Sequence, residues 1–233
     1  MFRSSRASPT GRTARLVAAV AALAVALGSG AVRANEGVTL PAPLKDVPPS
    51  KALATDTAVF AGGCFWGVEA VFRHVRGVKS AVSGYAGGEA ATAQYEIVSS
   101  GRTGHAESVQ VVYDPTQVSY GELLRIFFSV AHDPTELNRQ GPDVGTQYRS
   151  AIFTRSDAQM QVAKAYIAQL DAAHAFKAPI VTVVAPLPAF YRAEDYHQNY
   201  LALHPDQPYI VYNDLPKLDQ LKARFPDRYV AAR

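Results

Sequence analysis

A single cysteine, Cys64, constrains this chain more than any other residue. With one cysteine among 233 residues, no disulfide can close a loop within the chain. The cysteine follows a short apolar run, 57–61, that suits a buried strand. It precedes apolar side chains at helical spacing, namely Phe65, Val68, Phe72 and Val75. We therefore expect Cys64 to lie where a strand turns into a helix.

This position favours a reactive thiol. At the start of a helix, unpaired backbone N–H groups and the positive end of the helix dipole favour a thiolate over a thiol. Gly62 and Gly63 precede the cysteine and allow another molecule to approach the backbone closely. The alternative is an inert, buried cysteine. The turn and its paired glycines favour the reactive cysteine.

The first residues have the pattern of a secretory signal peptide. Residues 1–34 contain five arginines and no acidic residue, and their uninterrupted apolar run is the twelve residues Leu16–Leu27. As a helix this run would span ~18 Å, which is short of the ~30 Å hydrocarbon core of a bilayer. Small residues end the segment, as they do at cleavage sites. We expect export of a bacterial type to the periplasm or the cell exterior, with an uncleaved anchor as the alternative.

Removal of this segment changes the charge of the chain. The 23 basic and 20 acidic residues become 18 and 20, a net charge of −2. The remaining chain therefore lacks the excess of positive charge that is typical of proteins that bind nucleic acid. The proline-rich stretch 35–56 is predicted to be a linker. The remaining residues, about 175, suit one domain over 57–213 followed by a C-terminal tail, 214–233. We expect a monomer with no membrane association after cleavage.

The remaining patterns alternate between strands and helices. Strands are predicted at 78–85, 108–113, 150–154 and 180–185. Helices are predicted at 120–131 and 156–173, with caps at Ser119 and Ser156. Short strands with intervening helices predict a two-layer α+β sandwich with a mixed β-sheet.

Four polar or glycine-rich segments are candidates for a functional site. The glycine-rich run 84–88 lacks the lysine and the spacing of phosphate-binding loops. Segment 101–107 ends in a glutamate that directly precedes a predicted strand. Loop 141–149 presents Asp, Gln and Tyr side chains together. In segment 194–200 a histidine lies one turn from a glutamate, which is a weak metal signal. Each segment also has a structural explanation as a solvated end, a turn or a packed helix.

Taken together, these segments resemble the A type of peptide methionine sulfoxide reductase. The resemblance runs in order from about residue 57 to 213. The motifs that carry it are Gly-Cys-Phe-Trp-Gly-Val-Glu (63–69), Gly-Tyr-Ala-Gly-Gly (84–88), Thr-Gly-His-Ala-Glu-Ser-Val (103–109), Val-Tyr-Asp-Pro (112–115), His-Asp-Pro-Thr (132–135), Gly-Thr-Gln-Tyr-Arg-Ser (145–150) and Ala-Glu-Asp-Tyr-His-Gln (193–198).

The resemblance implies a fold and a reaction. The fold would be a ferredoxin-like core with long loops. The reaction would be reduction of methionine-(S)-sulfoxide, free or in proteins, with repair of oxidised exported proteins as its purpose. Cys64 would be the nucleophile that attacks the sulfoxide sulfur and is left as a sulfenic acid. Glu107 would be the proton donor, for which a partly buried carboxyl with a raised pKa is suited.

The resemblance also implies how the substrate is held. Tyr95 and Tyr148 would donate hydrogen bonds to the sulfoxide oxygen, and Asp143 would help to organise the site. Phe65 and Trp66 would form the apolar wall that receives the S-methyl group of the substrate. No bound cofactor and no metal are implied.

The chain departs from many family members in lacking a second, resolving cysteine. Ser99 stands at the place where many members have that cysteine, and the tail 214–233 has none. An internal disulfide step is therefore excluded. We expect an external thiol to clear the sulfenic acid, whether a thioredoxin-like protein, a glutaredoxin system or a small thiol such as dithiothreitol.

Two other classes of function fit a lone cysteine. A cysteine hydrolase or acyltransferase would pair Cys64 with a histidine such as His105 or His197 and would form an acyl-thiol first. A non-catalytic binding module would bury Cys64 and leave it unreactive toward a thiol probe.

Overall fold

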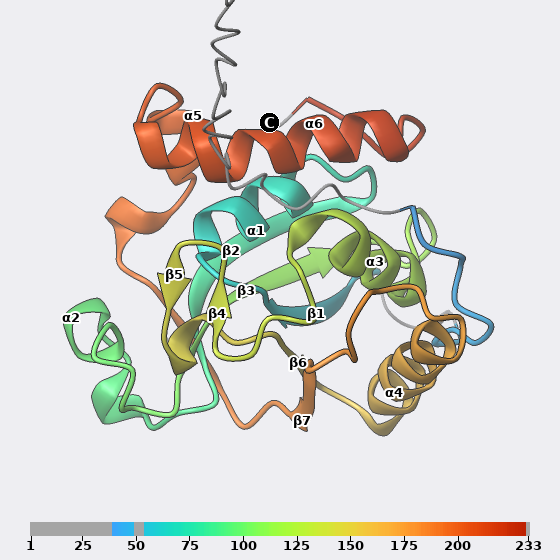
Figure 1. The fold of residues 1–233 in the computed structure, drawn as a ribbon, viewed down its shortest axis with the longest axis horizontal. Helices are drawn as coiled ribbons and strands as arrows, with labels where there is room; N and C mark the ends of the chain where they lie inside the picture. Colours follow the sequence, from blue (N-terminus) through green and yellow to red (C-terminus); the bar gives the residue numbers. More distant parts are fainter. Residues whose placement is uncertain (1–38, 49–53, 232–233) are drawn as a thin grey trace, which may run out of the picture. The chain divides into compact units, whose positions relative to one another are not determined.

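A six-stranded mixed sheet forms the centre of the fold (Figure 1), with the strand order β7-β6-β1-β3-β2-β8. All neighbouring strands are antiparallel except β6 and β7, which are parallel. The computed structural model describes residues 39–48 and 54–231, so the predicted signal peptide, 1–34, lies outside the described residues. The strands are β1 (Asp56–Ala61), β2 (Val78–Ala86), β3 (Ala106–Tyr113), β6 (Ala151–Thr154), β7 (Val183–Pro186) and β8 (Phe190–Arg192). The predicted α+β class with a mixed sheet is confirmed.

The helices lie between these strands and after them. They are α1 (Phe65–Arg73), α2 (Tyr95–Val98), α3 (Tyr120–Ile126), α4 (Asp157–Ala172), α5 (Tyr200–Leu203) and α6 (Leu215–Arg224). Two π-helical turns are η2 (Phe127–Ala131) and η5 (Ile210–Asp214), and three 3-10 turns are η1 (Ala90–Thr92), η3 (Thr146–Tyr148) and η4 (Asp195–His197). A small hairpin joins β4 (Arg139–Gln140) and β5 (Asp143–Val144). Within residues 39–48 and 54–231, no helix combines the length and apolar character needed to cross a bilayer.

Two of the helices begin where the sequence predicts. The hydroxyl oxygen of Ser119 accepts a hydrogen bond from the backbone N–H of Glu122, and that of Ser156 accepts one from Gln159, both at 3.2 Å. These bonds satisfy N–H groups that the first turn of a helix leaves without partners. The helix predicted over 120–131 forms as α3 followed by η2, so its last five residues widen into a π turn.

Strand β1 divides its side chains between two buried clusters. Ala58 and Phe60 belong to the main core, whereas Val59 and Ala61 belong to a smaller cluster of mostly small side chains. This alternation follows from the two-residue period of a strand. The ring of Phe60 stacks on Phe72 of α1, with ring centroids 5.0 Å apart. The stack ties α1 to β1 and so fixes the turn between them.

The described part of the predicted linker, 39–48, packs on the domain. Leu40 is buried, and its backbone N–H donates to the hydroxyl of Ser129 at 3.3 Å. The guanidinium of Arg125 donates to the carbonyl of Leu40 at 2.7 Å. The hydroxyl of Tyr166 in α4 donates to the carbonyl of Pro41, also at 2.7 Å. Residues 39–48 therefore follow the surface of α3, η2 and α4.

Three features differ from the sequence prediction or were absent from it. The strand expected at 180–185 begins only at Val183, because the N–H of Val181 bonds to the carbonyl of Pro134 instead of to β6. Strand β8, which is three residues long, was not predicted. The segment expected to be a tail contains α6, which buries Leu221 and lies along α1 (Figure 1). The finer description of the core as ferredoxin-like stays a prediction.

Candidate active site

Cys64 lies at the turn between β1 and α1, as the sequence predicts. It is the N-cap residue of α1, and its side chain is buried. Gly63 before it has φ +88°, a conformation that side chains with a Cβ rarely adopt. A Cβ on Gly63 would also lie 2.5 Å from the side chain of Gln140. A glycine at this position therefore allows Gln140 to close over the turn.

The first two N–H groups of α1 hold a thiol and a carboxyl group. The N–H of Phe65 donates to Oε2 of Glu107 at 3.1 Å, and the N–H of Trp66 bonds to the sulfur of Cys64. Glu107 lies on β3 and is 3% exposed. Burial raises the pKa of Glu107 from 4.5 to about 8, despite the opposing hydrogen bond from Phe65. Glu107 therefore holds a proton at neutral pH, as its expected role as an acid requires.

The thiol of Cys64 is also protonated at neutral pH in this arrangement. Burial raises its pKa well above 9.0, and the nearby carboxyl groups of Glu107, Asp214 and Asp143 raise it further. The N–H of Trp66 opposes these effects. The expected preference for a thiolate is therefore wrong, because burial and three carboxyl groups outweigh the start of the helix.

Asp143 lies on β5 and lines a cleft with Cys64. Its Oδ2 accepts a hydrogen bond from the hydroxyl of Tyr209. Burial raises the pKa of Asp143, whereas the bond from Tyr209 and the charge of Lys217 oppose that shift. The polar side chains that line this cleft beside Cys64 are Gln140, Asp143, Tyr209, Asn213, Lys217 and His132.

Tyr95 is the first residue of α2, and Tyr148 is the last residue of η3. Burial raises the pKa of both phenols, and the charges of Glu107 and Cys64 raise both further. Both hydroxyl groups therefore stay protonated and can donate hydrogen bonds. The fold brings both tyrosines into electrostatic contact with the thiol and the carboxyl group, although they are more than 50 residues apart in the chain.

Phe65 and Trp66 form an aromatic wall after Cys64. Phe65 is buried, and Trp66 is partly buried. Trp66 stacks on Tyr200 of α5, with centroids 3.8 Å apart and planes at 8°. Tyr209 meets Trp66 edge-on at 5.8 Å. These contacts hold the indole ring in one orientation, which an apolar wall requires.

His197 belongs to this wall, a placement that the sequence does not predict. Its Nδ1 accepts a hydrogen bond from the indole N–H of Trp66 at 3.2 Å, and its ring lies 4.4 Å from that of Tyr95. The neighbouring Glu194 accepts from the N–H of Tyr95 at 2.9 Å and from the hydroxyl of Tyr85 at 2.8 Å. Both groups of the weak metal signal thus have protein partners. Among the described residues, no group of three or more His, Cys, Asp or Glu side chains could hold a metal ion.

The histidines considered for a cysteine hydrolase bond to other groups. His197 accepts from Trp66, and Nε2 of His105 pairs with the carbonyl of Glu89 at 3.0 Å. Neither histidine is hydrogen-bonded to Cys64 in the part of the chain that the structure describes. The arrangement does not favour a cysteine–histidine pair.

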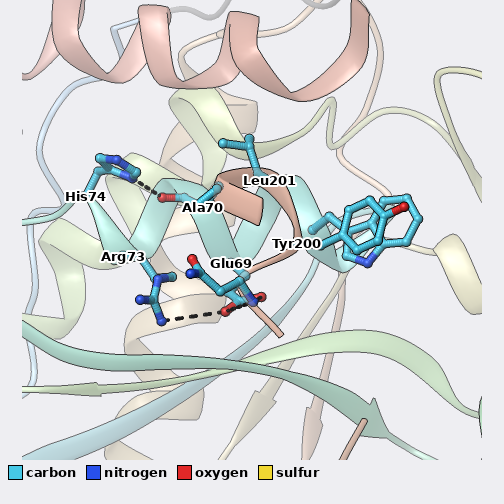
Figure 2. A pocket seen from close by; sticks show the side chains of 9 residues that line it. Glu69, Ala70, Arg73, His74, Tyr200 and Leu201 are labelled. Carbon is cyan, nitrogen blue, oxygen red and sulfur yellow. Dashed lines mark hydrogen bonds and ion pairs between the residues drawn. The ribbon is translucent and has the colours of Figure 1, made fainter. Parts of the chain in front are cut away.

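A second buried glutamate, Glu69, lies on α1 and forms an ion pair with Arg73 of the same helix (Figure 2). Its carboxylate accepts a hydrogen bond from the hydroxyl of Ser83 at 2.8 Å and two from the N–H of Asn199, at 3.0 and 3.1 Å. Arg73 lies 3.8 Å away as a charge partner. Because Asn199 is flanked by Gln198 and Tyr200, these bonds fix the segment that presses on Trp66.

The sequence analysis missed three further site residues: Tyr209, Asp214 and Lys217. All three lie near the end of the predicted domain or in the predicted tail. One signal could have found the last two, because Asp214-Leu215-Pro216-Lys217 has a helix-capping residue followed by a proline in the first turn. That pattern marks the start of α6 beside the cleft.

Comparisons with known sequences identify the family. The family model described as peptide methionine sulfoxide reductase matches residues 56–229. Peptide methionine sulfoxide reductase MsrA 2 of Mesorhizobium japonicum is 60% identical over 178 residues, which are 76% of this chain and 91% of that protein. The protein of the same name from a Synechocystis species is 54% identical over 211 residues, which are 90% of this chain and 98% of that protein.

Two solved structures resemble the fold. Mxr1 from Saccharomyces cerevisiae in its reduced form has a TM-score of 0.60 and 37% identity, covering 67% of this chain and 89% of that one. Methionine sulfoxide reductase A of Corynebacterium diphtheriae has a TM-score of 0.57 and 38% identity, covering 75% of this chain and 90% of that one. The chain therefore belongs to the peptide methionine sulfoxide reductase family and is an enzyme of its A type.

Proposed function

We propose that this enzyme reduces methionine-(S)-sulfoxide, free or in proteins, to methionine through a sulfenic acid at Cys64. The observation that carries the proposal is the shared helix start, where the N–H of Phe65 holds Glu107 and the N–H of Trp66 holds the thiol. A protonated carboxyl and a nucleophile are thereby fixed side by side. Acyl transfer would need a neighbouring base for Cys64, and the two candidate histidines bond elsewhere.

The reaction balances with these two groups alone. The sulfur of Cys64 attacks the sulfoxide sulfur while Glu107 gives its proton to the sulfoxide oxygen. The S–S bond formed by this attack and the S–O bond of the substrate then break, the hydroxyl group bonds to the sulfur of Cys64, and methionine leaves with one electron pair on its sulfur. The hydroxyl group ends on Cys64 as a sulfenic acid, so the cysteine is oxidised and the substrate is reduced. Cys64 attacks as the thiolate, so Glu107 is left as a carboxylate, and the thiol that the reductant restores returns one proton to the pair.

The surrounding side chains have matching proposed roles. Tyr95 and Tyr148 donate hydrogen bonds to the sulfoxide oxygen, because their raised pKa values keep their hydroxyl groups protonated. Asp143, held by Tyr209, organises the cleft side of the site. Phe65 and Trp66 receive the S-methyl group in a small apolar contact.

An external thiol completes the cycle in this proposal. The chain has one cysteine, and Ser99 is an exposed serine whose hydroxyl donates to the carbonyl of Tyr95 at 2.7 Å. Two outside thiol groups convert the sulfenic acid to a thiol, with release of water and formation of one disulfide. A thioredoxin-like protein, a glutaredoxin system or a small thiol supplies them.

We also propose that the enzyme is exported and acts as a monomer in the periplasm or outside the cell. What supports export is the basic, then apolar composition of residues 1–34, and the substrates would be oxidised exported proteins. The proposed domain organisation is a signal peptide (1–34), a linker (35–56), a catalytic domain (57–213) and a C-terminal segment (214–233).

A ferredoxin-like core is proposed for the inner strands. What supports it is the order β6-β1-β3-β2 with antiparallel neighbours, in which α1 connects β1 to β2 and α3 leads from β3 toward β6.

The direct test is turnover of a peptide containing methionine sulfoxide, with dithiothreitol as the reductant and the two sulfoxide epimers assayed separately. The parent enzyme should consume the S-epimer and leave the R-epimer. Cys64→Ser should abolish turnover and keep the thermal unfolding midpoint, because no other thiol exists in the chain. Appreciable turnover by Cys64→Ser, or equal consumption of both epimers, would contradict the proposal.

The lone cysteine makes the stoichiometry a second test. Without a reductant, excess substrate should give a burst of one methionine per chain, because one thiol supplies one reducing step. A dimedone-type reagent should then label Cys64 once, and mass spectrometry should show no disulfide within the chain. A burst of two methionines per chain would require a second reducing group and would rule out this cycle.

A further inference from the structure

A buried ion pair between Asp214 and Lys217 lies beside the start of α1. The Nζ of Lys217 is 3.1 Å from Oδ1 of Asp214. The Asp214 side chain is 0% exposed, and that of Lys217 is 16% exposed. The second carboxylate oxygen of Asp214 has no hydrogen-bond partner among the described residues. Lys217 is thus the charge partner of a fully buried carboxyl group, which is a costly arrangement to keep without a function.

The pair is packed directly against the first turn of α1. A Cβ placed on Gly67, three residues after Cys64, would lie 2.1 Å from Oδ1 of Asp214 and 2.7 Å from the Nζ of Lys217. Real side chains do not approach so closely, so the pair fits only because residue 67 is glycine. The fold thereby brings the Lys217 ammonium within one helical turn of the nucleophile's backbone.

The two members of the pair differ in their relation to the cleft. Lys217 lines the cleft that Cys64 lines, whereas Asp214 does not. We propose that Lys217, held by Asp214, is a positioning residue that places the compensating positive charge for the anionic form of Cys64. The proposal rests on the proposed function only in taking Cys64 as the nucleophile.

No other permanent cation lines this cleft among the described residues. The carboxyl groups that face Cys64 are Glu107 from β3, Asp143 from β5 and Asp214 from η5, and each opposes a thiolate. Burial lowers the pKa of His132 to about 3, so this cleft histidine is uncharged at neutral pH. The phenols around the site have raised pKa values and are uncharged too, namely Tyr95, Tyr148 and Tyr209. Among the described residues that line this cleft, Lys217 therefore supplies the positive charge that can offset the carboxyl groups around Cys64.

The inference predicts opposite effects for the two residues. Lys217→Met removes the positive charge and leaves Asp214 without its partner, so the thiolate of Cys64 should form at higher pH. Asp214→Asn removes a negative charge that faces Cys64 and leaves the charge of Lys217 unneutralised, so the thiolate should form at lower pH. The double variant removes both charges and should lie near the parent.

The experiment is the rate of Cys64 alkylation by iodoacetamide between pH 6 and pH 10, followed by mass spectrometry. The single cysteine gives one label per chain, and the measurement requires no turnover of methionine sulfoxide. We expect Lys217→Met to alkylate about tenfold more slowly at pH 8, which corresponds to a rise of about one pKa unit. Asp214→Asn should alkylate faster than the parent, and Lys217→Arg should retain most of the parent rate. Lys222→Met, at an exposed lysine of the same helix, is the matched control.

Each result decides the proposal. A folded Lys217→Met variant whose pH profile equals that of the parent would overturn it, as would a slower alkylation that the double variant does not reverse. If Lys217→Met does not fold, the comparison of Asp214→Asn with the double variant decides, since these two proteins differ only at Lys217. Slower alkylation of the double variant supports the proposal, and equal profiles overturn it. If the predicted shifts occur in an enzyme that does not reduce methionine sulfoxide, the proposed function fails and this inference stands.

Discussion

Two buried glutamates, Glu69 on α1 and Glu107 on β3, have contrasting surroundings. Glu69 is 1% exposed and Glu107 is 3% exposed. Glu69 accepts bonds from one hydroxyl and one backbone N–H, which reaches both of its oxygens, and it has an arginine 3.8 Å away. Glu107 accepts one N–H bond, and the charged groups that act on it are other carboxyl groups.

The groups around each buried carboxyl explain why Glu69 suits a structural role and Glu107 suits a chemical one. Burial raises the pKa of both carboxyl groups, but the donors and the arginine around Glu69 oppose that shift. Glu69 is therefore anchored as a hydrogen-bond acceptor that holds the segment behind Trp66. Glu107 has one donor and acidic neighbours, so its proton stays on at neutral pH and is available to a substrate.

The strongest test of this contrast is Glu107→Gln. The amide keeps the shape and can still accept the N–H of Phe65, but it cannot give up a proton to the sulfoxide. We expect sulfenic acid formation in a single turnover to slow by ~10²–10⁴-fold, with little change in substrate affinity. Rapid-quench measurement of methionine release checks this. A loss below about tenfold at neutral pH would move the acid role to another group, with Asp143 the first candidate.

The pH dependence of the parent enzyme sharpens the role of Glu107. Attack by a thiolate beside a protonated Glu107 requires that the thiol and carboxyl pair has lost one of its two protons. Because the pKa of Glu107 is about 8 and that of Cys64 is higher, kcat/KM should rise about tenfold per pH unit up to pH 8 and then level off.

In Glu107→Gln this rise should extend to higher pH, toward the pKa of the Cys64 thiol, which burial and the carboxyl groups of Asp214 and Asp143 still keep raised. A profile of kcat/KM against pH for both enzymes checks the assignment. A rate that falls through pH 8 in the parent would mean that both protons are needed for the reaction.

Replacing the two glutamates by glutamine should change the free energy of unfolding in opposite directions at high pH. Glu69→Gln places an amide opposite the donors of Ser83 and Asn199, and we expect a loss of about 1–3 kcal/mol in the free energy of unfolding. Glu107→Gln should cost little at pH 5. Since the folded pKa of Glu107 lies above its unfolded value, the parent loses stability as pH rises from about 4.5 to about 8.

The Glu107→Gln variant should therefore gain stability relative to the parent at pH 9. Urea unfolding at pH 5 and pH 9 measures both variants, with the exposed Glu96→Gln as the control. A Glu69→Gln variant that slows the chemical step as strongly as Glu107→Gln would remove the distinction between the two residues.

The smallest expected effect concerns one donor of Glu69. Ser83→Ala removes the buried hydroxyl that bonds to Glu69 at 2.8 Å, and we expect a loss of about 1 kcal/mol with unchanged turnover. Ser100→Ala removes an exposed hydroxyl, which bonds to the carbonyl of Ile97, and should change neither quantity. Thermal unfolding of the two variants side by side provides the measurement. Equal stability of both would show that Glu69 does not depend on this donor.

Much of the fold was predictable because the signals are local. The turn at Cys64, strand β3 and the caps at Ser119 and Ser156 follow from periodicity and capping residues within a few positions of one another. Strand β8 and the delayed start of β7 depend on partners that are distant in the sequence. Local patterns carry no information about such partners.

The sequence predicts which residues form the candidate site better than it predicts their protonation states. The resemblance gave Cys64, Glu107 and the two tyrosines, which the fold brings together. The protonation of Cys64 was misjudged, because a helix start is visible in the sequence whereas the carboxyl groups that gather around it are not. Lys217 was missed because the segment that carries it was interpreted as a tail.

The anchoring of residues 39–48 has a mechanical consequence for the strand that follows it. A pull on the N-terminal side is taken up first by the bonds of Leu40 and Pro41 to Arg125, Ser129 and Tyr166. These bonds lie on α3, η2 and α4, and strand β1, which ends at the active-site turn, comes later along the chain. Tension applied from the N-terminal side is thus diverted from the strand that positions the thiol.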